Sequence, residues 1–162
     1  MKLIFLHSSD IHGFLLPTDY QTKNDYDAPF SLSRVSSVIK AEKIKYGKDH
    51  VIVTDSGDCL QGSPLASYAH SINDYSALAE VTAAYNAAGY DARCVGNHDF
   101  NFGLDYLTYY VDNNDAPIIN DNVLDAQTDV PAFGKEYQIV EKAGIKVGLL
   151  GMTTQYLSLI HI

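Results

Sequence analysis

The chain has 162 residues, of which 46% are hydrophobic and 19% charged, and its 20 acidic and 11 basic residues give a formal net charge of -9. This composition indicates a globular domain and excludes a disordered or fibrous protein. The negative field would repel a polyanion, so we expect no binding to nucleic-acid polymers. Clustered carboxylates neutralised by divalent cations around a small phosphorylated ligand would fit the charge, and so would an acidic surface that only keeps the protein soluble.

The start of the chain carries no targeting or membrane signal. The apolar run at residues 3–6 is too short for a signal peptide and far shorter than the roughly 20 residues of a membrane helix. We therefore expect a cytoplasmic protein without membrane contact. Cys59 and Cys94 form neither a disulfide framework nor a CxxC metal motif, which predicts two buried free thiols.

Short apolar runs predict the strands in chain order. Residues 3–6, 51–53 and 145–152 are rich in Ile, Leu and Val, as expected for strands buried on both faces of a sheet, and a further apolar run surrounds Val95. Helical spacing of apolar residues lies between these runs. It predicts one helix that ends at Gly47, a second between Asn73 and Gly89, and a third after Gly103. The inward-facing residues of these helices are expected to be Leu32, Val35, Ile39 and Ile44, then Leu78, Val81, Tyr85 and Ala88, then Leu104, Leu107 and Val111.

Strands that alternate with helices predict an α/β domain with a largely parallel sheet, whose ligands gather at the carboxyl ends of the strands. A polar segment follows each of the first three strands: SSDIHG at 8–13, DSGDCLQGSP at 55–64 and GNHDFN at 96–101. We expect these segments to converge on one rim of the sheet.

The first two polar segments offer candidate metal ligands. Asp10 and His12 are two residues apart, so both can turn toward one ion once the chain leaves the strand, although a capped turn would explain the pair equally well. Asp58 follows Gly57, where the backbone allows close approach, and its two oxygens could bridge two cations. Asp55 is expected to cap the loop by accepting backbone N–H groups.

The third segment joins an amide, an imidazole and a carboxylate. Asn97 offers an uncharged oxygen ligand beside sites that already hold carboxylates. His98 would point elsewhere and could donate a proton or a hydrogen bond to a phosphate oxygen. Asp99 is expected to shape the turn, and Asn101 to reach back to His98. A neutral amide there can only orient the ring, whereas a carboxylate would also stabilise the imidazolium.

Taken in this order, DIHG, GD and GNHD at strand ends resemble the calcineurin-like metallophosphoesterase superfamily. The longer pieces DSGDCLQGSPLASY at 55–68 and GNHDFNFGLDYL at 96–107 more narrowly resemble the bacterial 5'-nucleotidase and 2',3'-cyclic-nucleotide 2'-phosphodiesterase family. The resemblance covers nearly all of residues 2–156. It implies a four-layer αββα sandwich and a hydrolase that uses a metal-activated water to cleave phosphoesters of nucleotides.

The resemblance also implies a role for each matching residue. Asp10 and His12 would bind one divalent metal ion, Asp58 would bridge two, and Asn97 would bind the second. His98 would be the catalytic imidazole. Manganese, zinc, iron or cobalt would serve, and nothing in the sequence selects among them.

The family pattern is incomplete in this chain. The later histidine ligands of the family, including a Gly-His-x-His segment, do not occur before Tyr156, and the C-terminal domain that binds the nucleobase is absent. We therefore interpret residues 1–156 as the N-terminal portion of a metallophosphoesterase catalytic domain. Residues 157–162 read as a non-native C-terminal scar, with an ordinary final strand as the alternative. His7, His50 and His70 match no ligand position and are expected at strand ends or on the surface.

Two functional interpretations follow. The first is an enzyme of nucleotide catabolism: a 5'-nucleotidase, a UDP-sugar hydrolase, or a 2',3'-cyclic-nucleotide phosphodiesterase with 3'-nucleotidase activity. Asn101 favours the second substrate class, because relatives resembling 5'-nucleotidases often carry aspartate there. The alternative is a non-catalytic metal- or nucleotide-binding fragment with an incomplete metal site. The sequence predicts no oligomeric state.

Overall fold

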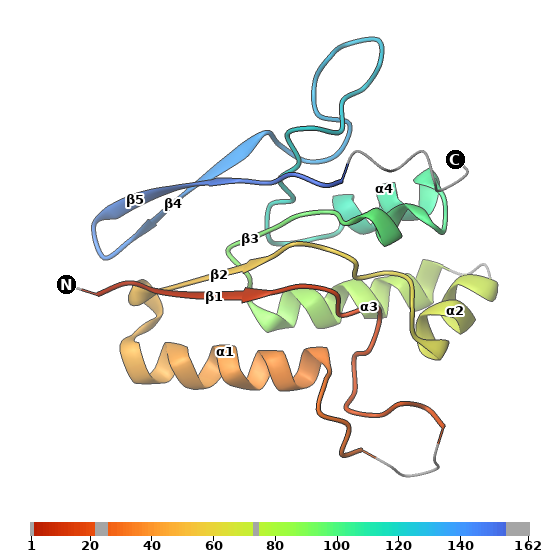
Figure 1. The fold of residues 1–162 in the computed structure, drawn as a ribbon, viewed down its shortest axis with the longest axis horizontal. Coiled ribbons are helices and arrows are strands. Elements are labelled where there is room, and N and C mark those ends of the chain that lie inside the picture. Colours follow the sequence, from red (N-terminus) through yellow and green to blue (C-terminus); the bar gives the residue numbers. More distant parts are fainter. Residues whose placement is uncertain (1, 22–25, 73–74, 155–162) are drawn as a thin grey trace.

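The computed structural model describes residues 2–21, 26–72 and 75–154 of the chain. Asn73, Tyr156 and residues 157–162 lie outside the described residues, so the predicted start of the second helix at Asn73, as its cap, and the C-terminal scar stay predictions. The elements in chain order (Figure 1) are β1 (Ile4–Ser8), α1 (Leu32–Tyr46), η1 (Lys48–His50), β2 (Val51–Asp55), α2 (Pro64–Ser71), α3 (Tyr75–Ala88), β3 (Ala92–Arg93), η2 (Asn97–Phe100), α4 (Leu104–Asp112), β4 (Tyr137–Lys142) and β5 (Ile145–Leu150).

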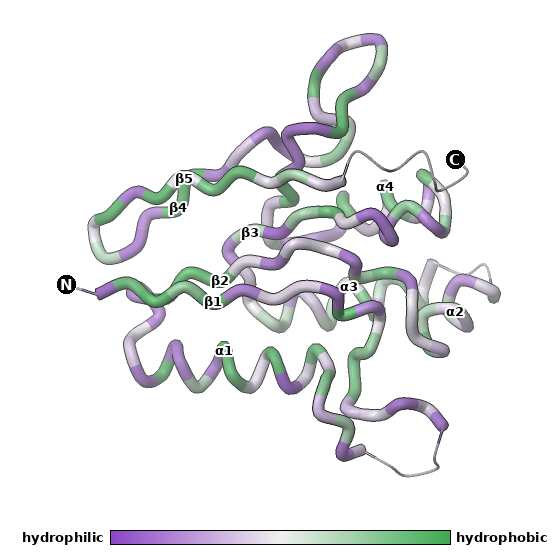
Figure 2. Tube along the Cα trace, viewed as in Figure 1, coloured by the Kyte–Doolittle hydropathy of each residue, from purple (hydrophilic) through white to green (hydrophobic). Residues whose placement is uncertain are grey.

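A three-stranded parallel sheet with the order β1-β2-β3 forms the centre of the molecule. Its register pairs Ser8 with Asp55 and Asp55 with Arg93, so the three strands end side by side at one edge. The central strand β2 is the most buried, with Val51 and Ile52 at 0% exposure, whereas burial alternates along the edge strand β1. Figure 2 shows apolar residues concentrated along the strands. The central strand β2 is therefore part of the buried core, and it holds the carboxyl ends of the three strands in place.

Helices cover one face of the parallel sheet and a β-hairpin covers the other. In Figure 1, α1 and α3 lie on one side of β1 and β2, and the antiparallel pair β4 and β5 lies on the opposite side, with β4 in contact with β2. This arrangement confirms the α/β class. It shows the helical layer, the parallel sheet and part of a second sheet; among the described residues no helix covers the outer face of the hairpin.

The prediction that residues 145–152 form a strand buried on both faces is wrong. Residues Ile145–Leu150 form β5, which among the described strands pairs with β4 alone, and its burial alternates between half-buried and exposed. Ala143 and Gly144 between the two strands both have positive φ, 51° and 76°. Two consecutive residues of this kind form the tight turn that reverses the chain into a hairpin.

The three predicted helices are present as α1, α3 and α4, and α2 is an additional one. Ser31 caps α1 by accepting a hydrogen bond from the backbone of Arg34. Ile44 and Leu104 do not face inward as expected, because they are 81% and 45% exposed. Leu104 is the first residue of α4, and the helix turns its inner face toward the core only from Leu107 onward.

The sequence carried a signal for α2 that the apolar pattern did not reveal. Ser63 accepts a hydrogen bond from the backbone of Ala66, and Pro64 occupies the first helical position. A serine cap followed by proline is a typical start of a helix.

Both cysteines are buried and free, which confirms the prediction. Burial raises the pKa of the Cys94 thiol to about 11, and it also raises the pKa of the Cys59 thiol well above its ordinary value. No helix in the described part of the chain is long and apolar enough to span a membrane.

Candidate metal centre

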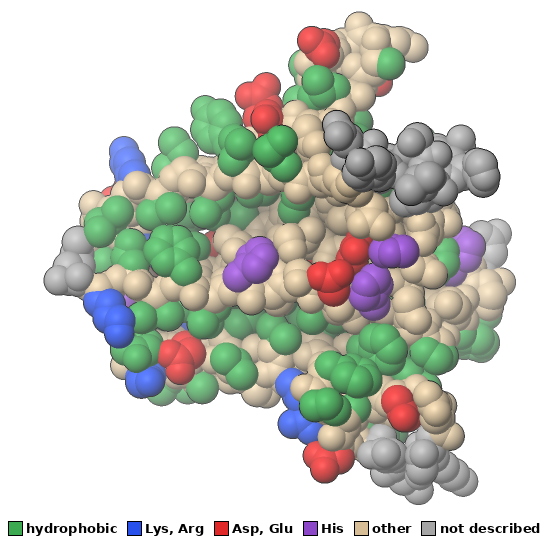
Figure 3. Space-filling model, viewed as in Figure 1, with side chains coloured by type: hydrophobic (Ala, Val, Ile, Leu, Met, Phe, Trp, Pro, Cys, Tyr) green, Lys and Arg blue, Asp and Glu red, His purple; other side chains and the backbone are tan. Residues whose placement is uncertain are grey.

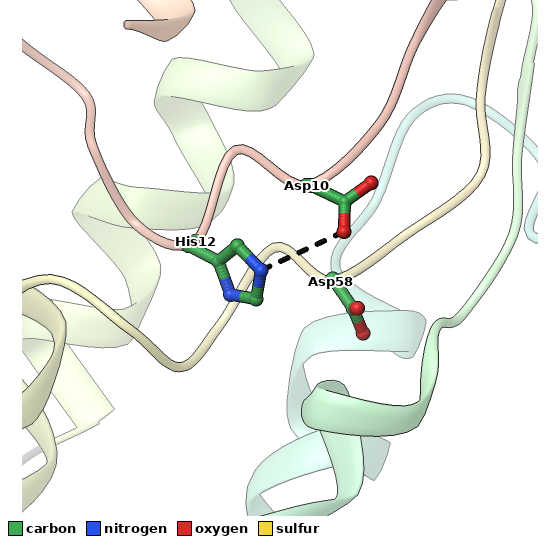
Figure 4. Close-up of side chains that lie close together, drawn as sticks. All are labelled: Asp10, His12 and Asp58. Carbon is green, nitrogen blue, oxygen red and sulfur yellow. Dashed lines mark ion pairs between the residues drawn. The ribbon is translucent and has the colours of Figure 1, made fainter. Parts of the chain in front are cut away.

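The loops after β1 and β2 meet at the carboxyl edge of the parallel sheet. The backbone N–H of Asp10 donates to the carbonyl of Gly57 at 3.1 Å, and that of His12 donates to the carbonyl of Asp58 at 2.7 Å. One ligand atom each from Asp10, His12 and Asp58 lies within 4.8 Å of the other two (Figure 4). In the same view as Figure 1, acidic and histidine side chains cluster on one face of the molecule, near the ends of β1 and β2 (Figure 3).

The backbone at these three residues adopts a left-handed conformation. Asp10, His12 and Asp58 have φ angles of 57°, 52° and 56°. Residues other than glycine adopt this region uncommonly, although Asp and His do so more readily than most. In these turns the side chains of Asp10 and His12 lie close together, with Nε2 of His12 3.7 Å from Oδ1 of Asp10. Non-glycine residues in this conformation concentrate at functional sites.

The hydrogen bond made by one nitrogen of the His12 ring leaves the other nitrogen able to bind a metal ion. Nδ1 lies 2.6 Å from the carbonyl oxygen of Gln61. A carbonyl only accepts, so Nδ1 donates its proton, and in the neutral ring Nε2 presents its lone pair, 3.7 Å from Oδ1 of Asp10. Gly62 provides the space, because a Cβ there would lie 2.6 Å from Cβ of His12.

Asp58 connects the loop after β2 to the turn formed by η2. Its Oδ1 accepts the backbone N–H of His98 at 2.7 Å, and the residue is only 8% exposed. The His98 ring lies 5.3 Å from the His12 ring, measured between centroids. Asn97 begins η2 beside this hydrogen bond and is half-buried; its role as a metal ligand stays a prediction.

Asn101 contacts the His98 ring, as the sequence suggested. Its Nδ2 lies 2.9 Å from Nδ1 of His98. An amide N–H donates, so Nδ1 of His98 acts as the acceptor and the neutral ring carries its proton on Nε2. The free edge of the ring is therefore a hydrogen-bond donor.

Asp99 has a larger role than the turn expected from the sequence. It is 0% exposed, and its carboxylate accepts backbone N–H groups from Asp58, Cys59 and Leu60 as well as from Gly96 in its own turn. Burial raises the pKa of this carboxyl, and the hydrogen bonds from Gly96, Leu60 and Cys59 act in the opposite direction. The sequence did not reveal these partners, because three of them lie about 40 residues away.

Comparisons with known proteins agree with this geometry. The chain is 34% identical over 161 residues to a 2',3'-cyclic-nucleotide 2'-phosphodiesterase/3'-nucleotidase from Salmonella typhimurium, covering 93% of this chain and 24% of that protein. The crystal structure of the calcineurin-like phosphoesterase YfkN from Bacillus subtilis superposes with a TM-score of 0.76 at 25% identity, covering 97% of this chain and 50% of that one. The chain belongs to the calcineurin-like metallophosphoesterase family.

A further structure agrees with this metallophosphoesterase assignment. A candidate 5'-nucleotidase from Staphylococcus aureus, crystallised with alpha-ketoglutarate, has a TM-score of 0.80 and 29% identity over 94% of this chain and 29% of that chain. No protein-family model matches the chain. The chain spans about a quarter of the length of the Salmonella protein, 24%.

Asp55 and Arg93 support the loop after β2 from inside. Oδ1 of Asp55 accepts the backbone N–H of Gly57 at 3.0 Å, which confirms the predicted cap. Arg93, 1% exposed, lies 3.7 Å from Asp55 and donates to Sγ of Cys59 at 2.8 Å, with its guanidinium 4.0 Å from the ring centre of Tyr85. Sequence reasoning missed the buried Arg93, which lies in an otherwise apolar run and is 1% exposed.

The donors present fit a divalent metal ion. Two carboxylates and an imidazole with its lone pair on Nε2 converge from two hydrogen-bonded loops. Oxygen and nitrogen donors of this kind suit manganese, iron, cobalt and zinc. His7, His50 and His70 lie outside the cluster: His7 contacts Thr54, His50 contacts the backbone of Lys2, and His70 stacks on Phe102.

Proposed function

We propose that this chain is part of an enzyme that hydrolyses phosphoesters of nucleotides with the help of two divalent metal ions. The observation that carries the proposal is the convergence of Asp10, His12 and Asp58 within 4.8 Å, with the His98 ring beside them. The names of the phosphoesterase relatives support the reaction class.

Four residues of the chain would bind metal ions, and His98 would contact the substrate. Asp10 and Nε2 of His12 would hold one ion, Asp58 would be shared between two, and Asn97 would hold the second. When bound, the ions would acidify a water molecule and neutralise charge on the phosphoryl oxygens. The remaining ligands of the second ion would come from parts of the protein outside this chain.

His98 would act on the substrate and not on a metal. Its Nδ1 is held by Asn101, so its Nε2–H is available to donate a hydrogen bond to a phosphoryl oxygen or a proton to the departing alkoxide. Its backbone N–H is bound to Asp58, which ties the position of the imidazole to that of the shared ligand.

A nucleoside 2',3'-cyclic phosphate or a 3'-nucleotide is the substrate class that we favour over a 5'-nucleotide. The Salmonella relative is named for those substrates and is 34% identical, compared with 29% for the candidate 5'-nucleotidase. Asn101 supports the same choice, because the family resemblance described above implies aspartate at this position in many 5'-nucleotidase-like relatives. The net charge of -9 argues against nucleic-acid polymers as partners.

The test uses the complete gene product and a panel of 2',3'-cyclic AMP, 3'-AMP, 5'-AMP and a UDP-sugar. We expect product formation that depends on added Mn²⁺ or Co²⁺ and is abolished by a chelator. Hydrolysis of 5'-AMP alone would reverse the substrate choice. Metal and nucleotide binding without hydrolysis of any substrate would instead establish the non-catalytic alternative.

A further inference from the structure

The Asp99 carboxylate joins two segments that are distant in the sequence. Oδ1 accepts the backbone N–H groups of Cys59 at 2.6 Å and Leu60 at 2.8 Å. Oδ2 accepts those of Asp58 and Gly96, both at 2.9 Å. Both oxygens of one fully buried side chain are therefore engaged by two N–H groups each.

The two segments also touch directly through their backbones. A Cβ on Gly57, where φ is 95°, would lie 2.1 Å from the backbone nitrogen of Gly96. A Cβ on Gly96 would lie 2.2 Å from Oδ1 of Asp58. No side chain fits between the segments at these positions, so hydrogen bonds across the contact must set their spacing.

The chemistry of the contact requires a carboxylate. Four N–H donors point at one side chain, and a carboxylate has acceptor capacity on both oxygens. An asparagine of the same shape has one acceptor oxygen, and its NH₂ group would face two N–H donors. The hydrogen bonds also compensate the cost of burying the charge.

We propose that Asp99 is a positioning residue of the metal centre. Its carboxylate fixes the backbone at Asp58 against the turn that carries Asn97 and His98, and so sets the distance between the shared metal ligand and the groups on η2. This inference rests on the metal-dependent function proposed above, and it assigns Asp99 no contact with metal or substrate.

The first experiment compares Co²⁺ binding by the complete protein and its Asp99→Asn variant, using the visible absorption of bound Co²⁺. We expect the variant to bind roughly 10- to 100-fold more weakly, as for other groups that orient metal ligands, and to show a changed spectrum at saturation. Asparagine nearly preserves the volume of the side chain, so the effect would report hydrogen bonding and not packing.

Leu107→Ala is the matched control for lost stability. Leu107 is 0% exposed in the core cluster on α4 and belongs to neither segment. At a temperature where both variants are folded, Leu107→Ala should keep the affinity and spectrum of the wild type. Equal losses in the two variants, or an Asp99→Asn variant with wild-type affinity and spectrum, would overturn the positioning role.

A second measurement needs no variant and covers the case in which Asp99→Asn does not fold. Amide hydrogen exchange in the wild type should show the N–H groups of Asp58, Cys59, Leu60 and Gly96 protected as one group, with closely similar rates. Exchange of these amides at the rates of an open loop would contradict the proposal. A wild type that binds no Co²⁺ would overturn the proposed function together with the positioning role, whereas tight binding by wild type and variant alike would overturn the positioning role alone.

Discussion

The two loops that form the candidate metal centre are supported very differently. The loop after β2 continues the buried central strand and is held from inside by Asp99 and Arg93, and its candidate ligand Asp58 is 8% exposed. The loop after β1 continues an edge strand, and the side chain of its candidate ligand Asp10 is 62% exposed. Asp10 and His12 are positioned by backbone hydrogen bonds to Gly57 and Asp58.

This difference implies an order of dependence within the site. We call the loop after β2 the platform, because the core holds it in place. The loop after β1 is positioned by its hydrogen bonds to this platform. A change in the platform should disturb every ligand, whereas a change at Asp10 should remain local.

The largest effect is expected from separating the chain from the rest of the protein. Among the described residues, Asp10, His12 and Asp58 form the only cluster of three His, Cys, Asp or Glu ligands, so the 162-residue chain alone should bind Mn²⁺ weakly and turn over little substrate. Isothermal titration and phosphate release decide the matter. Two tight sites per chain with robust hydrolysis would show that both loops suffice without further ligands.

In the complete protein, Asp58→Ala should be more damaging than Asp10→Ala. We propose Asp58 as the ligand shared by two ions, so its loss should lower metal content at both positions, while Asp10→Ala should lower it at one. Elemental analysis of the purified variants measures this. Asp58→Asn serves as a control for the left-handed backbone, because asparagine tolerates φ near the observed 56° better than alanine. If Asp10→Ala emptied both sites and Asp58→Ala did not, the order of dependence would be reversed.

His98→Ala should leave the metals bound and lower kcat by roughly 10²- to 10⁴-fold, the range typical for loss of a general acid. The alanine keeps the backbone N–H that binds Asp58, so the platform should stay intact. Metal content and kcat are measured on the same sample. A variant that loses its metal in proportion to its activity would show that His98 is a ligand.

Asn101→Asp should change the proton position on the His98 ring. The amide of Asn101 donates to Nδ1, whereas a carboxylate would accept from it and move the neutral ring's proton from Nε2 to Nδ1. Nitrogen NMR of the ring distinguishes the two forms. We expect a loss in kcat/KM of roughly tenfold, at the low end for groups that orient a functional histidine. Identical ring spectra in wild type and variant would show that residue 101 does not select the form of the ring.

The smallest effect is on stability. Gly57→Ala combines an unfavourable φ of 95° with a backbone clash, and Gly103→Ala has a similar φ of 89° with nothing within 4 Å of the new Cβ. Both should destabilise, Gly57→Ala by at least about 1 kcal/mol more than the strain alone. Urea denaturation of the two variants gives the difference. Equal free energies of unfolding would mean that the two segments can separate without cost.

The sequence by itself determined the chemistry of the site and the elements that precede it. Apolar runs placed β1 and β2, and helical spacing placed α1, α3 and α4. Local rules also sufficed for Asp55, which accepts the N–H of a residue two positions away. Such features depend on neighbours within a few residues, which a sequence shows directly.

Only the tertiary structure decided how the pieces meet. Asp99 reaches Asp58 across 41 residues, and Arg93 reaches Cys59 across 34, through contacts that exist only once the strands are in register. The same holds for the exposure of Ile44 and for the pairing of β5 with β4 in place of the parallel sheet. Residue types and local spacing specify which groups are available, whereas strand register and backbone contact between distant loops specify the distances at which they act.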